Sequence, residues 1–251
     1  MGSVLGASHV VKKSETCYSI AKKYSVTVGQ LMSANGIKDP RDLMLGQKIT
    51  IPSKNWKKSK VSTKAAQSVK KPRTKSLRVV IDPGHGGRDK GAVWGGVYES
   101  SLNLRVANRV EASLKAKGYP VVMSRRSDVY VSLSRRSQIA NRYRNAIFVS
   151  IHFNATIHTS ARGAETFYVG KRGSYLAKSI QNELVKNCKV RNRGIRNRSY
   201  SVLRQTHCPA VLVECGFISN SHERSRCKTS SYQAAAARAI VAGIERYDRV
   251  Y

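Results

Sequence analysis

A strongly basic stretch divides this chain of 251 residues into two unequal parts. Residues 54–78 contain ten lysines or arginines and no acidic residue, and they show no repeating apolar pattern. Such a stretch cannot bury enough apolar surface to pack, and its like charges repel one another. We therefore expect a basic flexible linker over residues 54–76 between a small domain at 7–53 and a larger domain at 77–251.

The small domain is predicted to be a strand–helix–helix–strand unit. Two segments in its middle repeat apolar residues at helical spacing, and Ser14 and Thr27 stand where their N-caps are expected. A core of this size contributes little stability, and the segment holds no cluster of acid, base and nucleophile, so binding is favoured over catalysis. The expected elements are strands over 8–13 and 46–52 and helices over 14–26 and 27–37.

The larger domain alternates short apolar runs with amphipathic segments. This alternation predicts an α/β fold with a mainly parallel sheet and flanking helices. In such folds ligands bind at the carboxyl ends of the strands. The expected strands are 77–82, 119–124, 146–152, 163–169 and 209–215, and the expected helices are 101–117, 131–144, 173–187 and 230–247.

The net charge of +32 points to a polyanionic environment, which nucleic acid, an anionic cell envelope or an acidic membrane surface would supply. No nucleic-acid-binding motif is present, and the basic residues are spread along the chain, so we expect no nucleic-acid partner. No run approaches the length of a membrane span, and no signal-peptide pattern occurs. The five cysteines form no C-x-x-C pair and are expected to be mostly buried.

Four titratable residues are predicted to meet at one edge of the sheet. His85, His152 and Glu214 each follow or end a predicted strand, and Glu99 begins the helix after the first strand. Each alone has an ordinary interpretation, because single histidines are common and a glutamate suits a helix N-terminus. A carboxylate that ends the apolar run at 210–213 is harder to explain, since buried carboxylates need a cation, a metal or a proton.

Two histidines and one carboxylate suit zinc with an open coordination position, and a second carboxylate can take a proton from water. Motifs of other enzyme classes are absent: the chain has no nucleotide-binding glycine loop and no G-x-S-x-G elbow. Three S-x-x-K matches occur, at Ser19, Ser68 and Ser225, which is what the abundance of serine and lysine produces by chance.

Residues 9–52, HVVKKSETCYSIAKKYSVTVGQLMSANGIKDPRDLMLGQKITIP, resemble a LysM module over their whole length. The resemblance implies a βααβ domain that binds glycans containing N-acetylglucosamine, such as peptidoglycan. Where the family usually has Gly-Asp-Thr-Leu, this chain has Ser14-Glu15-Thr16-Cys17. Thr16 is the residue of this module that we expect to contact the glycan.

Residues 77–251 resemble the zinc-dependent N-acetylmuramoyl-L-alanine amidases of bacterial cell-wall metabolism. The resemblance implies that His85, Glu99 and His152 bind one zinc ion and that Glu214 is the catalytic glutamate. It further implies hydrolysis of the amide between muramic acid and L-alanine, with Glu214 taking the proton of water and returning it to the leaving amine. The motifs that carry it are VVIDPGHGGRDKGA (79–92), Glu99 with LNL (102–104), SRRSDVYVSLSRRSQIAN (124–141), FVSIHFNA (148–155), RGAETFY (162–168) and PAVLVECGFISN (209–220).

The sequence also suggests roles for several other residues. Asn154 follows His152 closely enough to contact substrate, and Asp128 with Arg136 fits a structural ion pair. His158 and His207 are candidates for substrate contact or for no role. The stretch 169–209 is too short to add an inhibitory helix to its own helix, so we expect an accessible site without built-in autoinhibition.

The leading hypothesis is thus a secreted peptidoglycan amidase, tethered to its insoluble substrate by the LysM module and the basic linker. The alternatives are a zinc peptidase that cuts within the stem peptide and a binding-only cell-wall protein. We expect a monomer without a membrane span, located in the periplasm, the cell wall or the extracellular space.

Overall fold

The computed structural model divides the chain into two compact units, Met1–Ser68 and Val69–Tyr251. The predicted linker falls largely on residues outside the described part of the chain, so it stays a prediction. The structure describes residues 7–12, 15–37, 40, 43, 46–53 and 74–251.

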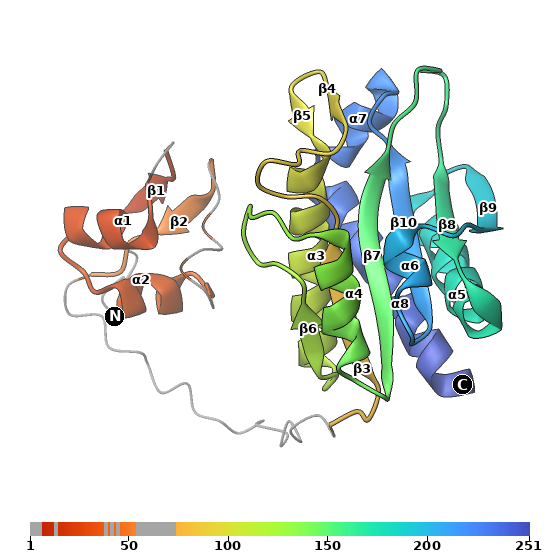
Figure 1. The fold of residues 1–251 in the computed structure, drawn as a ribbon. Helices are drawn as coiled ribbons and strands as arrows, with labels where there is room; N and C mark the ends of the chain where they lie inside the picture. The colour runs from red at the N-terminus through yellow and green to blue at the C-terminus, as the bar shows by residue number, and fades with distance from the viewer. Residues whose placement is uncertain (1–6, 13–14, 38–39, 41–42, 44–45, 54–73) are drawn as a thin grey trace. The chain divides into compact units, whose positions relative to one another are not determined.

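The first unit contains the predicted βααβ order. Strand β1 (Ser8–Val10) pairs antiparallel with β2 (Lys48–Thr50), and helices α1 (Cys17–Lys23) and α2 (Val28–Ala34) lie between them in the chain (Figure 1). Both strands are shorter than predicted. Their core is small, and its buried apolar residues are Val11, Cys17, Ile20, Ala21, Leu31, Ile49 and Ile51.

Helix caps and polar bridges reinforce this small core. Thr27 caps α2 as predicted, but α1 begins later than expected: Thr16 is its N-cap, and Ser14 lies outside the described residues. The side chain of Asn35 joins α2 to β2, because its amide donates to Thr50 O at 2.8 Å and its oxygen accepts from Thr50 N at 2.7 Å. Such bonds to a backbone matter where few apolar contacts are available.

The second unit is built on a six-stranded sheet in the order β6-β3-β7-β10-β8-β9. The first four of these strands are mutually parallel, β8 runs antiparallel to β10, and β9 runs parallel to β8. The predicted α/β fold with a mainly parallel sheet is therefore confirmed. The strands are β3 (Arg78–Pro83), β6 (Val121–Met123), β7 (Ala146–Asn154), β8 (Ala164–Tyr168), β9 (Asn192–Asn197) and β10 (Ala210–Phe217).

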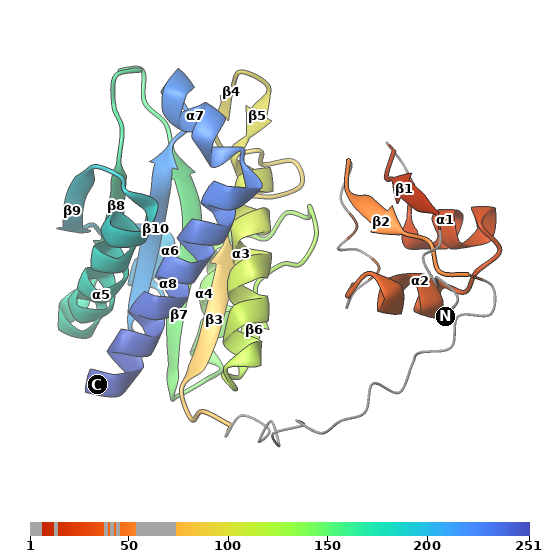
Figure 2. The same ribbon diagram turned by 180° about the vertical axis from the view of Figure 1, so that it is seen from behind.

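Helices cover both faces of this sheet. Figure 2 shows α3 (Glu99–Ala116), α5 (Gly170–Cys188) and α8 (Ser230–Val250) on one face, and Figure 1 shows α4 (Leu133–Asn141) and α6 (Ser201–Arg204) on the other. The predicted apolar stripe of α3 is fully or almost fully buried, and each such side chain contributes about 1.5–3 kcal/mol. Its members are Leu102, Val106, Val110 and Leu114.

All five predicted strands and all four predicted helices of this unit are present, with shifted ends. The edge strand β9, the short helices α6 and α7 (Ser221–Cys227) and the hairpin of β4 (Val93–Trp94) and β5 (Val97–Tyr98) were not predicted. These elements are short or highly charged, so they lack an apolar period long enough to recognise.

The expectation that most of the cysteines are buried is confirmed. All five cysteines are free, and four of them are buried. Among the described residues, no helix combines the length and the apolar character that crossing a membrane requires.

Candidate functional site

His85 lies in the loop that follows β3, in a backbone conformation that side chains rarely adopt. Its φ is +58°, which is uncommon for a residue other than glycine. The surrounding glycines leave room for the site: a Cβ at Gly84 would overlap the ring of His152, and one at Gly91 would lie 2.6 Å from Glu99 Oε2. The glycines that flank His85 therefore let the predicted ligands approach one another.

Glu99 is the first residue of α3 and is buried, with 5% of its surface exposed. One carboxylate oxygen lies 2.7 Å from His152 Nδ1, and the other lies 3.2 Å from His85 Nε2. The same carboxylate accepts hydrogen bonds from Ala92 N at 2.9 Å and from Asn103 Nδ2 at 3.2 Å. Both oxygens of Glu99 are thus engaged and fixed in orientation.

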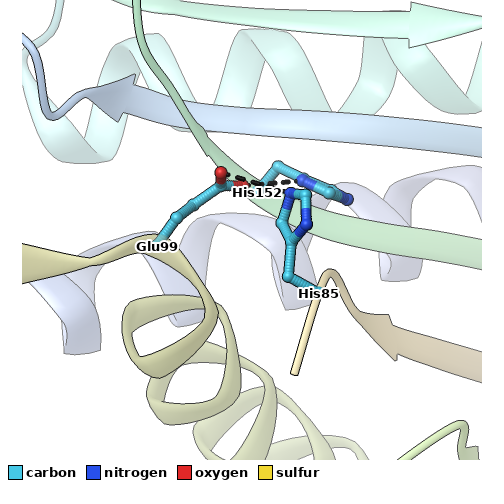
Figure 3. A group of neighbouring side chains, drawn as sticks. All are labelled: His85, Glu99 and His152. Carbon is cyan, nitrogen blue, oxygen red and sulfur yellow. Dashed lines mark hydrogen bonds and ion pairs between the residues drawn. The ribbon is translucent and has the colours of Figure 1, made fainter. Parts of the chain in front are cut away.

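The structure brings the three predicted ligand residues together. One donor atom from each of His85, Glu99 and His152 lies within 4.8 Å of the other two (Figure 3). The two rings are 5.0 Å apart and nearly perpendicular, so both can present a nitrogen to one point. Helix start, loop and strand each contribute one residue, as Figure 3 shows.

This donor set fits a divalent cation. Burial would raise the pKa of Glu99, but the hydrogen bonds and charges of His152 and His85 hold that pKa well below its usual value, so the carboxylate stays ionised. On the far side of His85, Nδ1 lies 2.8 Å from Asp89 Oδ2. A carboxylate behind a metal-binding imidazole fixes its tautomer and raises its basicity. Two imidazoles and one carboxylate are a common zinc set.

Two buried arginines hold the loop of His85 in place. Arg136 donates to His85 O at 2.8 Å and pairs with the buried Asp82 at 2.7 Å. Arg125 donates to four backbone carbonyls around the same loop and the start of α3, and each bond is between 2.8 and 3.0 Å long. These carbonyls belong to Pro83, Gly84, Ser100 and Ser127.

The expected ion pair between Asp128 and Arg136 is wrong. Arg136 is buried, as an ion-paired structural arginine would be, but its partner is Asp82 at the end of β3. Asp128 instead accepts from Gly87 N at 2.9 Å and lies 3.2 Å from Lys90 Nζ. Asp128 is exposed, so it cannot neutralise a buried guanidinium as Asp82 does.

Glu214 lies in β10 directly opposite His152 in the neighbouring strand β7. Its Oε2 atom is buried and has no hydrogen-bond partner among the described residues. Burial, and secondarily the charges of Glu99 and Glu165, raise the pKa of Glu214 well above its usual value. A carboxyl group with a raised pKa holds a proton more readily than an ordinary glutamate does, which suits a proton-transfer role.

The two predicted substrate contacts have other contacts of their own. Asn154 ends β7 on the side of the site, and its amide donates to Glu165 Oε1 at 2.8 Å. Thr16 caps α1, where its hydroxyl accepts from Ser19 N at 3.1 Å. Thr16 is exposed, and a role of either residue in binding substrate stays a prediction.

His158 and His207 do not join the cluster. Both are exposed, and His207 precedes β10, at the sheet edge opposite to that of Glu214. A cavity of about 340 Å³ is lined by His85, His152 and Tyr200, among others. In the part of the chain that the structure describes, 27% of the His85 side chain is exposed, and the absence of an inhibitory segment stays a prediction.

The sequence patterns do not indicate a role for Glu165, Asp89 or Arg125. Glu165 is a charged residue inside a buried strand, which is the same signal that singled out Glu214. Asp89 follows His85 by four residues in the same glycine-rich loop. Arg125 offered no local signal, because its role depends on carbonyls from three separate segments.

The sheet presents this donor set at the carboxyl edge of its parallel strands, and the neighbouring strand adds a further carboxylate. This is the site composition of a single-metal hydrolase. Residues 79–246 match the N-acetylmuramoyl-L-alanine amidase family, and residues 9–52 match the LysM domain. The chain belongs to the N-acetylmuramoyl-L-alanine amidase family.

Known amidases resemble this chain in sequence and in structure. N-acetylmuramoyl-L-alanine amidase LytC of Bacillus subtilis is 38% identical over 193 residues, which are 75% of this chain and 39% of LytC, so the chain spans well under half of that relative. The crystal structure of an N-acetylmuramoyl-L-alanine amidase from Clostridium difficile 630 superposes with a TM-score of 0.67 at 39% identity, covering 69% of this chain and 97% of that one. The catalytic domain of the amidase CwlV from Bacillus (Paenibacillus) polymyxa gives a TM-score of 0.67 at 34% identity, covering 70% and 99%.

Proposed function

We propose that this chain is a zinc-dependent N-acetylmuramoyl-L-alanine amidase that hydrolyses the amide between N-acetylmuramic acid and the L-alanine of the stem peptide. The observation that carries the proposal is the convergence of His85, Glu99 and His152 beside Glu214, whose Oε2 atom is buried and has no hydrogen-bond partner among the described residues. Family membership supports the reaction, and the geometry supports the assignment of these residues to it.

The residues divide the work between them. His85, Glu99 and His152 would hold zinc, which when bound polarises a carbonyl and makes water more acidic. Glu214 takes the proton of the attacking water and then donates it to the amine of L-alanine as the amide breaks. Its buried position favours the protonated form, which helps the second of these two steps.

The LysM unit supports binding to peptidoglycan, and the extreme positive charge suits an anionic wall polymer. We propose that the protein acts in the periplasm, the cell wall or the extracellular space and that its linker keeps the catalytic unit near its substrate. A monomer suffices for the chemistry, because every residue named for the site comes from one chain.

The test is mass spectrometry of peptidoglycan fragments after incubation with the protein. Free stem peptides that begin at L-alanine are expected, and they should disappear with a chelator or in Glu214→Gln. Glu183→Gln is the matched control, since Glu183 is a partly exposed glutamate on α5. Shortened stems still attached to muramic acid would replace this proposal with a peptidase, and intact fragments that sediment with the wall would replace it with a binding protein.

A further inference from the structure

Glu165 extends the row of chemical side chains by one strand. In the register of the sheet, Glu214 of β10 is paired with His152 of β7 on one side and with Glu165 of β8 on the other. Paired residues in adjacent strands point to the same face of a sheet. Glu165 therefore lies beside Glu214, on the side away from the predicted metal ligands.

Two arginines of the edge strand β9 accompany Glu165. Arg193 Nε lies 3.6 Å and Arg196 Nε lies 3.3 Å from Glu165 Oε2, while Asn154 donates to the other oxygen. Glu165 is buried, with 5% of its surface exposed. One carboxylate between two guanidinium groups leaves the cluster with one positive charge in excess.

Most N–H donors of Arg193 and Arg196 remain available to a ligand. Neither guanidinium donates a hydrogen bond to any residue in the described part of the chain, and Arg193 Nε is buried without an acceptor. Arg193 packs over the ring of Phe217 at 4.8 Å, which fixes its plane, whereas 46% of the Arg196 side chain is exposed. A planar guanidinium with free donors matches a carboxylate in a bidentate contact.

The reaction proposed above places an anion within reach of this cluster. Glu214 protonates the amine of L-alanine, so the stem peptide begins at Glu214. The second stem residue is a glutamate linked through its side chain, whose α-carboxyl is free unless it has been amidated. The first two stem residues, when extended, span about 7 Å. Strand β9 lies two strand spacings, or about 9.6 Å, from β10, and the arginine side chains shorten that gap.

We propose that Arg196, oriented by Glu165 and assisted by Arg193, binds the free α-carboxylate of the second stem-peptide residue. The contact makes the enzyme favour stems that carry this carboxylate over stems in which it is amidated. This inference rests on the proposed amidase function and adds the chemical feature of the stem that the site selects.

The experiment compares two synthetic N-acetylmuramoyl-L-alanyl-D-glutamate substrates in which the side-chain carboxyl is blocked as an amide, as it is in the stem: one has a free α-carboxylate and the other has it amidated. The chain should cleave the carboxylate substrate with a kcat/KM about 10- to 100-fold higher, as expected for a charged hydrogen bond. Arg196→Gln should remove that preference by slowing only the carboxylate substrate. Arg196→Lys keeps the positive charge but loses the planar pair of N–H donors that can contact both oxygens of a carboxylate. This variant should therefore retain part of the preference.

Arg172→Gln is the matched control, because Arg172 is an exposed arginine near the start of α5, beyond the opposite end of β8. It removes the same charge and should leave the preference intact. Equal cleavage of both substrates, or an equal loss on both in Arg196→Gln, would overturn the inference. Failure to cleave either substrate would count against the amidase function instead.

A binding measurement tests the inference without turnover. Titration of L-alanyl-D-glutamate with a free or an amidated α-carboxyl, the side-chain carboxyl being blocked as an amide in both, should show tighter binding of the α-carboxylate form to the intact chain. Arg196→Gln should make the two affinities equal. Equal affinities in the unmodified chain would contradict the inference whatever the activity.

Discussion

The two carboxylates at the centre of this site have opposite surroundings. Glu99 has both oxygens engaged, by two imidazoles, a backbone amide and the side chain of Asn103. Glu214, one strand from His152, is also buried at its Oε2 atom, yet that atom has no partner among the described residues. The first arrangement holds a fixed negative charge in place, and the second leaves a group free to change its protonation.

This difference explains why one sheet edge can serve two purposes. A ligand for a metal must stay ionised and rigid, which hydrogen bonds and charge partners ensure. A proton-transfer group needs a pKa closer to neutral, which burial and nearby carboxylates provide. The structure assigns these environments to two glutamates whose residue type alone does not distinguish them.

The largest effect is expected from Glu99→Gln. The amide removes the negative charge between His85 and His152 and should therefore release the metal and abolish amidase activity together. Zinc content after gel filtration and cleavage of muropeptides would be measured on the same sample. Retention of a full equivalent of zinc by Glu99→Gln would contradict the distinction drawn between Glu99 and Glu214.

Glu214→Gln should impair proton transfer at this sheet edge and leave metal binding intact. Loss of an acid–base group lowers the rate by about 10²- to 10⁴-fold. Zinc content should be unchanged, and thermal stability should be equal or higher, because the buried group no longer has a charged form to desolvate. Metal loss in this variant would place Glu214 in the ligand set and remove the distinction drawn above.

Asp89→Asn should give an intermediate effect, confined to the metal half of the site. The carboxylate behind His85 Nδ1 orients and activates that imidazole, and loss of such a partner lowers metal affinity or activity by about 10- to 100-fold. Competition with a chromogenic chelator would measure the affinity. Addition of excess zinc should restore most of the activity of Asp89→Asn and none of that of Glu214→Gln.

The smallest effect on chemistry is expected from Asn35→Ala in the LysM unit. Its side chain bonds α2 to β2, and loss of these largely solvent-exposed hydrogen bonds should cost about 0.5–1.5 kcal/mol of that unit's stability. Hydrolysis of soluble muropeptides should be unchanged, since the catalytic residues lie in the other unit. Calorimetry of the whole chain and a turnover assay would show whether a structural network, unlike the two glutamates, affects stability alone.

Much of this molecule follows from local sequence. The periods of the apolar residues determined the α/β order, because a strand and a helix bury their apolar side chains at different spacings. The convergence of His85, His152 and Glu214 also followed, since the ends of parallel strands share one edge. Thr27 was recognisable as a cap, whereas α1 was assigned a cap two residues early because Ser14 and Thr16 both suit that position.

Only the tertiary structure decided which distant residues became partners. The sheet order places β8 between β10 and β9, and that order brings Glu165 beside Glu214 and the arginines of β9 beside Glu165. Likewise, Arg136 pairs with Asp82 instead of Asp128, because only Asp82 lies at the end of a buried strand beneath α4. Periodicity and spacing describe a segment and its immediate neighbours. The order and direction of strands depend on how helices pack across the whole sheet, and that packing also sets the electrostatic environment of each buried charge.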